Sequence, residues 1–557
     1  MNPSAWREAG LVLLTRALAE LSYEDMLRPE PLGDRRYRAV FGDVEYTFTA
    51  DRGAFESWQI DADSVRRNGE PADDPMEFLV DARDALGLDG PTTAEALREL
   101  VATWSADALL RQNLPTAKEL ADASYVDLEA AQAGHPAMVL NKGRLGFTAS
   151  DAEAYAPEAG RTLRLTWIAV HPSLASAHGV SLDDELDPAT RRAFRAPEGY
   201  VWLPVHPFHL DACVRTLFAP YLADGRIVIL GEAPDRYRVL ASVRTLVNVD
   251  HPEKRNVKVP LLIRNTLVWR GLPAGPTAGA PAVSSWLHAL RASDPFLKEH
   301  VDLLGEVASV AVRHPLFDRV PDAPYRYHEL LAAVWREPVQ TYLRDGEKAR
   351  SLASLLVTGS DGVPLVAELT NRSGLPAAVW IRKLIDVVLA APLHALHTHD
   401  LAFCPHGENT VVVFGPDDVP VRTMLKDFAE DVNLLPGRSY EGLPDEADRL
   451  LPRWPEKELA HSIVTAVFAG VFRPLAVLVD VPEFWTLVRE SVDAYFDDRP
   501  ELAERREAYG LTAPEVERIC LNREQLTGGG FHDRAEKEEF EIVHGTVPNP
   551  LVREAGR

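Results

Sequence analysis

Cysteine is scarce in this chain. Its 557 residues include only three, Cys213, Cys404 and Cys520, and no two of them form a CxxC pair. Disulfide frameworks and structural zinc sites both depend on closely spaced thiols, so neither is expected here. The sequence therefore predicts a chain that folds without cross-links in a reducing compartment, which we expect to be the cytoplasm.

Long apolar runs are also missing. No stretch reaches 18 uninterrupted apolar residues, so no transmembrane span is expected. Residues 1–26 carry charges among apolar residues at helical spacing, and they lack a cleavage-site pattern. This segment therefore predicts an amphipathic helix and not a signal peptide.

The common signatures of nucleotide-binding and hydrolytic sites are absent. The sequence has no GxxxxGK[ST], no GxGxxG after a strand, no GxSxG and no HExxH. A phosphate-binding site would therefore have to be assembled from separate side chains.

Basic residues are outnumbered, and the formal net charge is -25. Such a surface repels nucleic acids and anionic membranes, so we expect neither as a partner. Any site for a polyanion must be a local cluster of Arg and Lys.

The spacing of apolar residues changes near residues 130 and 320, from helical intervals to short β-rich runs and back again. A chain this long exceeds a single core, and the changes predict an α+β fold with three parts. Residues 1–128 are expected to be a mainly helical domain, 129–320 a β-rich domain with an antiparallel sheet, and 321–557 a second helical domain.

Hydrophobic periodicity predicts the individual elements. Helices are expected at 11–21, 74–88, 96–114, 327–343, 378–399 and 461–479. Strands are expected at 37–41 and 45–50, at 162–170, 200–205, 227–231, 237–249, 257–263 and 266–272, and in a hairpin at 408–414 and 419–427.

Four segments concentrate side chains suited to phosphate and carboxylate chemistry. They are GHPAMVLNKGRLGF (134–147), LPVHPFHLD (203–211), the stretch from ASVRTLVNV to IRNTLVWRGL (241–272), and CPHGEN with LKDFAED (404–431). Their candidate residues are His135, Lys142 and Arg144; His206 and His209; Ser242, Arg244, Thr245, Lys258, Arg264, Thr266 and Arg270; and His406, Glu408, Asn409, Asp427 and Glu430.

ATP-dependent activation of a carboxylate requires these residue types together. Arg and Lys neutralise phosphate and carboxylate charge, and Ser and Thr hydroxyls add directional donors. Asp, Glu and Asn oxygens suit Mg²⁺, and a His can stabilise charge or move a proton. Each segment alone also has an ordinary structural explanation, such as a solvated strand face or a turn histidine.

Two other patterns predict chemistry less directly. His394, His397 and His399 end an apolar helix, where they could bind a metal or simply pack. Cys404 lies two residues from His406, which leaves thiol catalysis open.

Taken in order, the motifs HP…KGRLGF, LPVHP, SVRT, K…T…R, HGEN and KDF resemble the NRPS-independent siderophore synthetases, the IucA/IucC family. The resemblance covers roughly residues 130 to 440, with VPNPL (547–551) as a weaker match. It implies an open-hand shape of thumb, fingers and palm. It also implies adenylation of a carboxylic acid with release of pyrophosphate, followed by capture by an amine, in an enzyme that uses ATP and Mg²⁺ and forms a homodimer.

The resemblance also implies roles for individual residues. Arg270, His406 and Lys258 are expected to be catalytic. ATP or its phosphates are expected at Ser242, Arg244, Thr245, Lys258, Thr266, Asn409 and Asp427. The substrate carboxylate is expected at His135, Lys142, Arg144 and Arg270, and Mg²⁺ at Asn409, Asp427 and Glu408.

Departures from the family pattern bear on the substrate. Met138 and Val139 replace a second His-Pro, Cys404 replaces a frequent Glu, and Glu408 replaces a frequent Gln. The form PHGEN resembles the subgroup of the family that acts on monoesters or monoamides of dicarboxylic acids more than the citrate-using subgroups. If Met138 and Val139 face the pocket, they also favour a half-amide over citrate; otherwise they pack in the core and the PHGEN resemblance alone carries the inference. The same sequence also permits a citrate-using ligase of the family, a catalytically silent binding protein of the same fold, or a small-molecule kinase.

Overall fold

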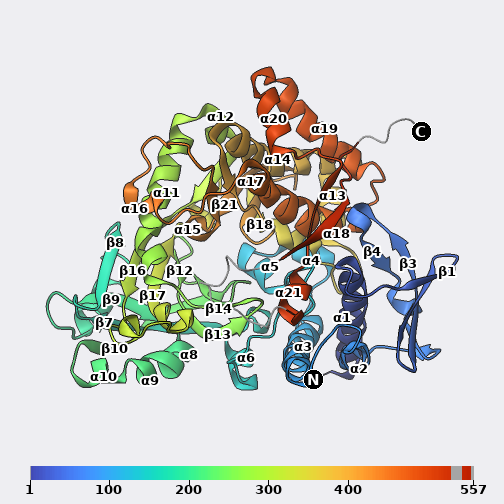
Figure 1. The fold of residues 1–557 in the computed structure, drawn as a ribbon. Coiled ribbons are helices and arrows are strands. Elements are labelled where there is room, and N and C mark those ends of the chain that lie inside the picture. Colours follow the sequence, from blue (N-terminus) through green and yellow to red (C-terminus); the bar gives the residue numbers. More distant parts are fainter. Residues whose placement is uncertain (1, 528–541, 553–557) are drawn as a thin grey trace.

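The computed structural model describes residues 2–527 and 542–552. Figure 1 shows the β-rich middle of the chain on one side, the N-terminal segment on the other, and the C-terminal helices across the top. Helices and sheets occupy separate layers, and the large sheet is antiparallel, so the predicted α+β class is confirmed.

The N-terminal part packs helices against a small sheet. Helix α1 (Pro3–Tyr23) begins where the Asn2 side chain accepts a hydrogen bond from the Ser4 amide, and Pro3 suits its first turn. The Leu13 and Leu18 side chains of α1 pack with Trp104 of α3 (Gly90–Gln112) in the core of this part. Helix α2 (Pro75–Ala82) completes the helical layer.

The predicted strand pair forms here, inside a larger sheet than expected. Strands β2 (Arg36–Phe41) and β3 (Val44–Arg52) are antiparallel and turn at Gly42, whose φ of 58° favours glycine. The sheet also contains four short strands that the sequence did not predict. They are β1 (Glu30–Gly33), β4 (Trp58–Ile60), β5 (Arg66–Arg67) and β6 (Glu70–Pro71).

Among the described residues, eight strands form the large sheet, in the order β8-β16-β17-β12-β11-β10-β7-β9. Their bounds are β7 Thr162–Val170, β8 Ala175–Gly179, β9 Val201–Val205, β10 Ile227–Val239, β11 Thr245–Asn248, β12 Asn256–Lys258, β16 Glu306–Val312 and β17 Leu331–Arg336. Helix α11 (Ala274–Ser293), which the sequence did not predict, packs on β16. The predicted strands 162–170, 200–205 and 227–231 are confirmed, and the third continues to Val239. The predicted strands 237–249 and 257–263 are each divided by a turn, and of 266–272 only Val268–Arg270 is a strand.

One helix prediction is wrong. Residues 327–343 form strand β17, followed by a short 3-10 turn, Val339–Tyr342. All six residues of β17 are buried, because the strand lies between β16 and β12 with both faces covered. A continuous apolar run of this kind looks the same in a buried strand and a buried helix. The sheet therefore extends past residue 320, the boundary expected from composition.

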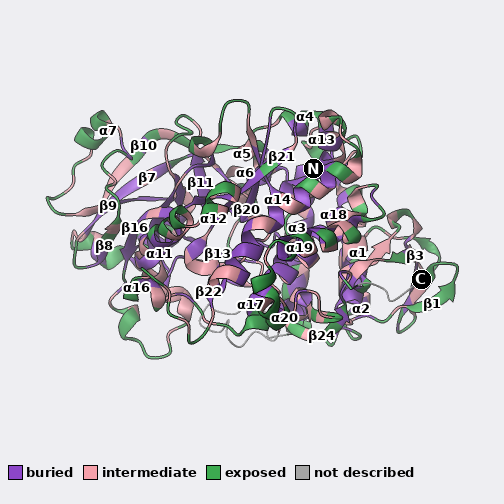
Figure 2. Ribbon diagram, turned by 90° about the horizontal axis from the view of Figure 1, so that it is seen from above, coloured by how far each residue is buried: buried purple, intermediate pink, exposed green. Residues whose placement is uncertain are grey.

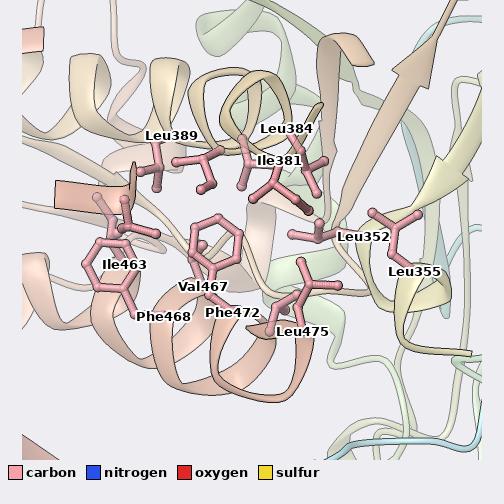
Figure 3. Close-up of a cluster of buried hydrophobic side chains, with 14 of the residues drawn as sticks. Leu352, Leu355, Ile381, Leu384, Leu389, Ile463, Val467, Phe468, Phe472 and Leu475 are labelled. Atoms are coloured by element: carbon pink, nitrogen blue, oxygen red, sulfur yellow. The ribbon is translucent and has the colours of Figure 1, made fainter. Parts of the chain in front are cut away.

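The C-terminal part is built around α14 (Ala377–His399). A continuous helical segment of α17 (Glu456–Ile463), a π-helical stretch (Val464–Phe472) and α18 (Arg473–Leu478) contributes side chains to the same core. Figure 3 shows Ile381, Leu384 and Leu389 of α14 facing Val467 and Phe472 of this segment. Figure 2 shows buried residues gathered along these central helices and exposed residues at the periphery.

The segment Glu456–Leu478 is long and apolar enough to span a membrane by length and composition, and half of its most apolar window is buried within the protein. Its buried apolar side chains form part of the hydrophobic core shown in Figure 3.

The predicted hairpin belongs to a second sheet, in the order β15-β21-β20-β18. Strands β20 (Thr410–Phe414) and β21 (Pro420–Lys426) are antiparallel, and β15 (Val301–Leu304) runs parallel to β21. Strand β18 (Lys348–Ser351) pairs with the other side of β20. Strand β21 ends at Lys426, and the next residue, Asp427, contacts Lys258 and Arg336 at the ends of β12 and β17 of the large sheet.

Buried histidines predict how stability depends on pH. Burial lowers the pKa of His206 to about 3 and those of His209 and His397 to about 4. Between pH 6.5 and 5 the unfolded chain therefore binds protons at these residues that the folded chain does not, and unfolding becomes easier as pH falls. Glu24 and Glu99 act in the opposite direction, because burial raises their pKa values to about 7 and about 8. The three buried histidines outnumber the two buried glutamates, so we expect the destabilising effect of acidification to dominate.

We expect the melting temperature to fall measurably between pH 6.5 and pH 5, since a tenfold difference in proton affinity is worth about 1.4 kcal/mol. Thermal unfolding at three pH values measures this, and replacing the exposed His251 by Gln should leave the trend unchanged. A melting temperature that is constant or rises on acidification would contradict the expectation.

Candidate active site

Four polar side chains share one face of the large sheet. Thr245 lies opposite Lys258 across the β11–β12 ladder, and Asn256 and Glu306 both lie opposite Arg336. Opposed residues project from the same face, and Lys258 is two residues from Asn256. The pleat therefore gathers Thr245, Lys258, Arg336 and Glu306 at one place.

The end of β21 supplies the opposite charges. Lys258 Nζ lies 2.5 Å from Asp427 Oδ1, 3.4 Å from Glu430 Oε2 and 3.7 Å from Glu306 Oε1. Arg336 NH1 contacts Asp427 Oδ2 at 2.9 Å. Burial alone would raise the pKa of Asp427, but Lys258 and Arg336 hold it well below its usual range. These residues form the charged cluster of the site, and its cations are positioned before any ligand binds.

The SVRT turn adds two donors to the charged cluster. Val243 adopts a φ of 67°, which a β-branched residue rarely does. This turn directs Arg244 to the Gly271 carbonyl and to Glu430 Oε2, 3.2 Å away. The buried Ser242 Oγ has no hydrogen-bond partner among the described residues. An unused buried hydroxyl beside Arg and Lys fits a phosphate oxygen, so the residues present fit ATP.

A second strained turn holds Arg270. Strands β13 (Leu261–Asn265) and β14 (Val268–Arg270) form a hairpin in which Thr266 has a φ of 58°. Arg270 NH2 donates to Thr266 Oγ1 at 2.5 Å. Gly271 packs so closely on Glu329 that a Cβ there would lie 2.3 Å from Glu329 Cγ. The hairpin therefore places Arg270 next to the carbonyl that Arg244 contacts.

The HGEN turn brings His406 and Asn409 together through a residue that the motif does not contain. Asn409 Nδ2 donates to Asp431 Oδ2 at 2.5 Å, and His406 Nε2 lies 3.9 Å from the same oxygen. The Glu408 amide donates to His406 Nδ1 at 3.3 Å. Surrounding protein lowers the pKa of His406 although 37% of its side chain is exposed, and Glu408 and Asp427 only partly offset this. The imidazole is therefore neutral near pH 7.

The donor set also fits Mg²⁺. Asp427, Glu408 and Asn409 offer oxygen ligands, which this ion prefers. Among the described residues, the one group of three Asp, Glu, His or Cys ligand atoms within 4.8 Å lies elsewhere, at Asp294, His394 and His399. The oxygen ligands are thus not preassembled into a cage, as suits an ion that is held partly by phosphate.

The residues expected at the substrate carboxylate divide into two kinds. Lys142 is buried and contacts Asp107 at 2.8 Å, while Arg144 is buried with both terminal nitrogens on Glu158. Protein carboxylates already neutralise both charges. His135 is solvent-exposed, yet enclosure by protein, with the charges of His406 and Arg473, lowers its pKa. Of the three residues, His135 is the one whose pKa is affected by His406.

The apolar wall proposed from Met138 and Val139 is not formed by Val139. Val139 is 6% exposed and packs in the core of the N-terminal part, and Met138 is 3% exposed. The Val139 amide donates to Asn522 Oδ1 at 2.8 Å, which turns this stretch inward. Packing in the core, the second of the two expectations for this pair, describes Val139 correctly.

Several residues of the site were missed by sequence reasoning. They are Glu129, Glu306, Arg336, Lys426 and Asp431. Glu129 Oε2 accepts a hydrogen bond from the Ala241 amide at 3.3 Å. Burial and the charge of Arg336 lower the pKa of Lys426, and the charge of Glu129 only partly offsets this. Lys426 and Asp431 lie within the LKDFAED segment, and Arg336 is a charge at the end of an apolar strand, so these three carried a signal. Glu129 carried none.

Helix α21 (Leu521–Thr527) secures two of the loops. Asn522 Nδ2 donates to the Ala137 carbonyl at 2.7 Å and to Glu24 Oε1 at 2.7 Å. Gln525 Nε2 donates to Glu99 Oε2 at 3.0 Å and contacts the Thr266 carbonyl at 3.4 Å. In Figure 1, α21 lies among the N-terminal helices despite its late place in the sequence.

Comparison with known proteins identifies the family. Residues 124–357 match the family model described as IucA / IucC family. The rhizobactin siderophore biosynthesis protein RhbF of Rhizobium meliloti (strain 1021) is 34% identical, over 98% of this chain and 96% of that protein. The chain belongs to the IucA/IucC family. Residues 378–532 also match a model described as ferric iron reductase FhuF-like transporter.

Solved structures of the family share the fold. Aerobactin synthetase IucC from a hypervirulent pathotype of Klebsiella pneumoniae superposes with a TM-score of 0.87 at 29% identity, covering 99% of each chain. ATP-bound aerobactin synthetase IucA from the same source superposes with a TM-score of 0.76 at 17% identity, covering 98% of this chain and 100% of that one. The second likeness concerns the fold alone.

Proposed function

We propose that this chain is an ATP-dependent ligase of siderophore biosynthesis, which activates a small carboxylic acid and joins it to an amine. The observation that carries the proposal is the charged cluster around Lys258 and Asp427, together with the Ser242 hydroxyl of the SVRT turn, which has no hydrogen-bond partner among the described residues. Membership of the IucA/IucC family and relatives named for rhizobactin and aerobactin support it.

The cationic residues of the site and the neutral His406 have separate proposed roles. Lys258, Arg244, Thr245 and Ser242 would hold the phosphates of ATP, and Thr266 orients Arg270 towards the carboxylate. ATP would supply its adenylyl group to the carboxylate with departure of pyrophosphate, and AMP would then leave when the amine attacks the acyl carbon. Positioned cations stabilise the negative charge that develops as each of these groups departs. Neutral His406, held near Asp431, can accept or relay the proton that the amine loses on acylation.

A cavity of about 930 Å³ offers room for a substrate arm. Gly134 and Pro136 line it on either side of His135, together with Arg16 of α1 and Arg473 of α18. Both of these guanidinium charges contribute to the lowered pKa of His135. We propose that this cavity receives the amine-bearing substrate and that His135 lies between it and His406.

The substrate proposed from the HGEN variant is a half-amide of a dicarboxylic acid. With Val139 in the core, this proposal depends on the resemblance around Glu408 alone. A location in the cytoplasm and a homodimeric state remain proposals on the same footing.

Product analysis tests the function. The purified chain is incubated with ATP, Mg²⁺, a diamine or hydroxylated diamine, and either citrate or an N-succinyl half-amide at equal concentration. We expect AMP, pyrophosphate and an amide of the predicted mass, with the half-amide preferred. Formation of ADP would instead indicate a kinase, and ATP binding without turnover would indicate a silent binding protein. Preference for citrate would overturn the substrate proposal and leave the ligase proposal standing.

Dependence on Mg²⁺ is a separate prediction. Excess chelator is expected to abolish pyrophosphate release, and added Mg²⁺ to restore it, because Asp427 and Asn409 offer oxygen ligands beside the phosphate-binding cations. Asp427→Asn should raise the Mg²⁺ concentration needed for half-maximal rate. As a control, Asp250→Asn removes a carboxylate that pairs with Arg236 at the surface. Full activity in chelator would contradict the prediction.

A further inference from the structure

Three metal-ligating side chains converge between two helices, away from the residues of the charged cluster. Asp294 precedes α12 (Pro295–His300), and His394 and His399 lie in the last turns of α14. Asp294 Oδ2 lies 3.0 Å from His394 Nε2 and 2.7 Å from His399 Nε2. The three side chains are 11%, 9% and 20% exposed.

The carboxylate is fixed with one oxygen turned towards the histidines. Asp294 Oδ1 caps α12 by accepting hydrogen bonds from the Phe296 amide at 2.8 Å and the Leu297 amide at 3.0 Å. Oδ2 is left for the two imidazoles. These cap bonds, with those from His399 and His394, outweigh burial and lower the pKa of Asp294 to about 2. The carboxylate is therefore ionised at neutral pH.

The histidines are oriented by contacts behind them. His394 Nδ1 contacts the Tyr495 hydroxyl at 3.0 Å, and the imidazole stacks on Phe296 with ring centroids 4.3 Å apart. A metal-binding histidine commonly uses its second nitrogen for such a contact, which fixes the ring and its tautomer. His397, the third histidine of this stretch, instead contacts the Leu393 carbonyl at 2.9 Å and packs against Phe496.

We propose that Asp294, His394 and His399 form a binding site for a divalent transition metal ion, with Zn²⁺ as the best match. Two imidazoles and one carboxylate are ligands for zinc-like ions and not for Mg²⁺ or Ca²⁺. Ligand atoms on a tetrahedral Zn²⁺ lie roughly 3.3 Å apart, so Asp294 Oδ2 needs to separate from His394 Nε2 and His399 Nε2 by only about 0.3 and 0.6 Å. The three ligand atoms all lie within 4.8 Å of one another. Partial exposure leaves the fourth position to water.

The proposed metal site is connected through α12 and β15 to β21, the strand that ends just before Asp427. Helix α12 leads directly into β15, which runs parallel to β21 from Val301 opposite Thr423 to Leu304 opposite Lys426. A metal between α12 and α14 would stabilise the start of β15 and, through it, the strand that presents Asp427. The proposal concerns structure and does not depend on the proposed function.

Metal binding to the untagged full chain tests the proposal. After chelator treatment, Zn²⁺ is added back and measured by mass spectrometry, and Co²⁺ serves as an optical probe. We expect one equivalent of tightly bound Zn²⁺ per chain, Co²⁺ bands typical of a four-coordinate site, and a rise in melting temperature with Zn²⁺ that Mg²⁺ does not produce. Absence of stoichiometric Zn²⁺ would overturn the proposal and leave a hydrogen-bonded His–Asp–His group.

Variants separate the metal from the helix cap. D294N retains the cap, because Asn caps helices as well as Asp, but removes the charged ligand, so affinity should fall at least about 100-fold. Y495F keeps all three ligands and should weaken binding about tenfold. The control H328Q removes a surface histidine that lies 3.2 Å from Asp318, and binding should be unchanged. Unaltered affinity in D294N and Y495F would contradict the assignment even if both variants fold normally.

Discussion

Replacing Arg270 by alanine is expected to lower kcat/KM for pyrophosphate release at least about 100-fold while the chain remains folded. The guanidinium is held by the Thr266 hydroxyl at 2.5 Å, on a hairpin that Gly271 packs against Glu329. Loss of a positioned charge from a shielded site costs on the order of 3 kcal/mol in the transition state. Steady-state kinetics with ATP and the preferred acid measures the effect, and thermal unfolding monitors the fold.

Two companion variants sharpen this experiment. Arg270→Lys retains the charge but not the planar fork, so its rate should lie between those of wild type and Arg270→Ala. Arg236→Ala removes a guanidinium that pairs with Asp250 at the surface and should leave kcat/KM unchanged. Near-normal turnover in Arg270→Ala would remove this residue from the proposed machinery.

His406→Ala is expected to cause a loss of similar size, in the range of 100-fold or more that general acid–base groups contribute. Because the surroundings lower its pKa below the usual value near 6.5, His406 is neutral at pH 7 and becomes protonated only on acidification. The wild-type rate should therefore fall on the acid side of that value. The residual rate of His406→Ala should lack this acid limb.

The pH profile distinguishes a chemical role from a structural one. A general loss of folding would lower the rate at every pH without removing the acid limb. The exposed His251, replaced by Gln, provides a matched control in which both rate and profile should be retained. A His406→Ala variant with an unchanged pH profile would refute the assigned role.

Much of the site was predictable because its residues lie in short motifs with local geometry. Ser242 and Arg244 share one turn, and His406 and Asn409 share another, so each pair is near in space wherever the turn lies. Helices α1, α3 and α14 were predicted from the local spacing of their apolar residues. Periodicity failed in residues 327–343, where burial on both faces removes the polar side that would reveal a strand.

The remaining features of the site could not be predicted, because they depend on contacts between segments that are far apart in the sequence. Arg336 meets Asp427 across 91 positions, and Lys258 meets Asp427 across 169. Which carboxylate neutralises which cation depends on the register of the β11–β12–β17 ladder and on where β21 ends. Lys142 and Arg144 illustrate the same limit, because only the fold shows that Asp107 and Glu158 neutralise them.

The sequence by itself determined the family, the α+β class and the residue types of the turns proposed to bind phosphate, because spacing within a motif follows from local backbone geometry. Only the tertiary structure decided that Val139 packs in the core, that Asp431 joins His406 to Asn409, and that Asp294 meets His394 and His399. Each of these depends on how separate helices and strands pack, and burial of apolar side chains, not spacing along the chain, determines that packing.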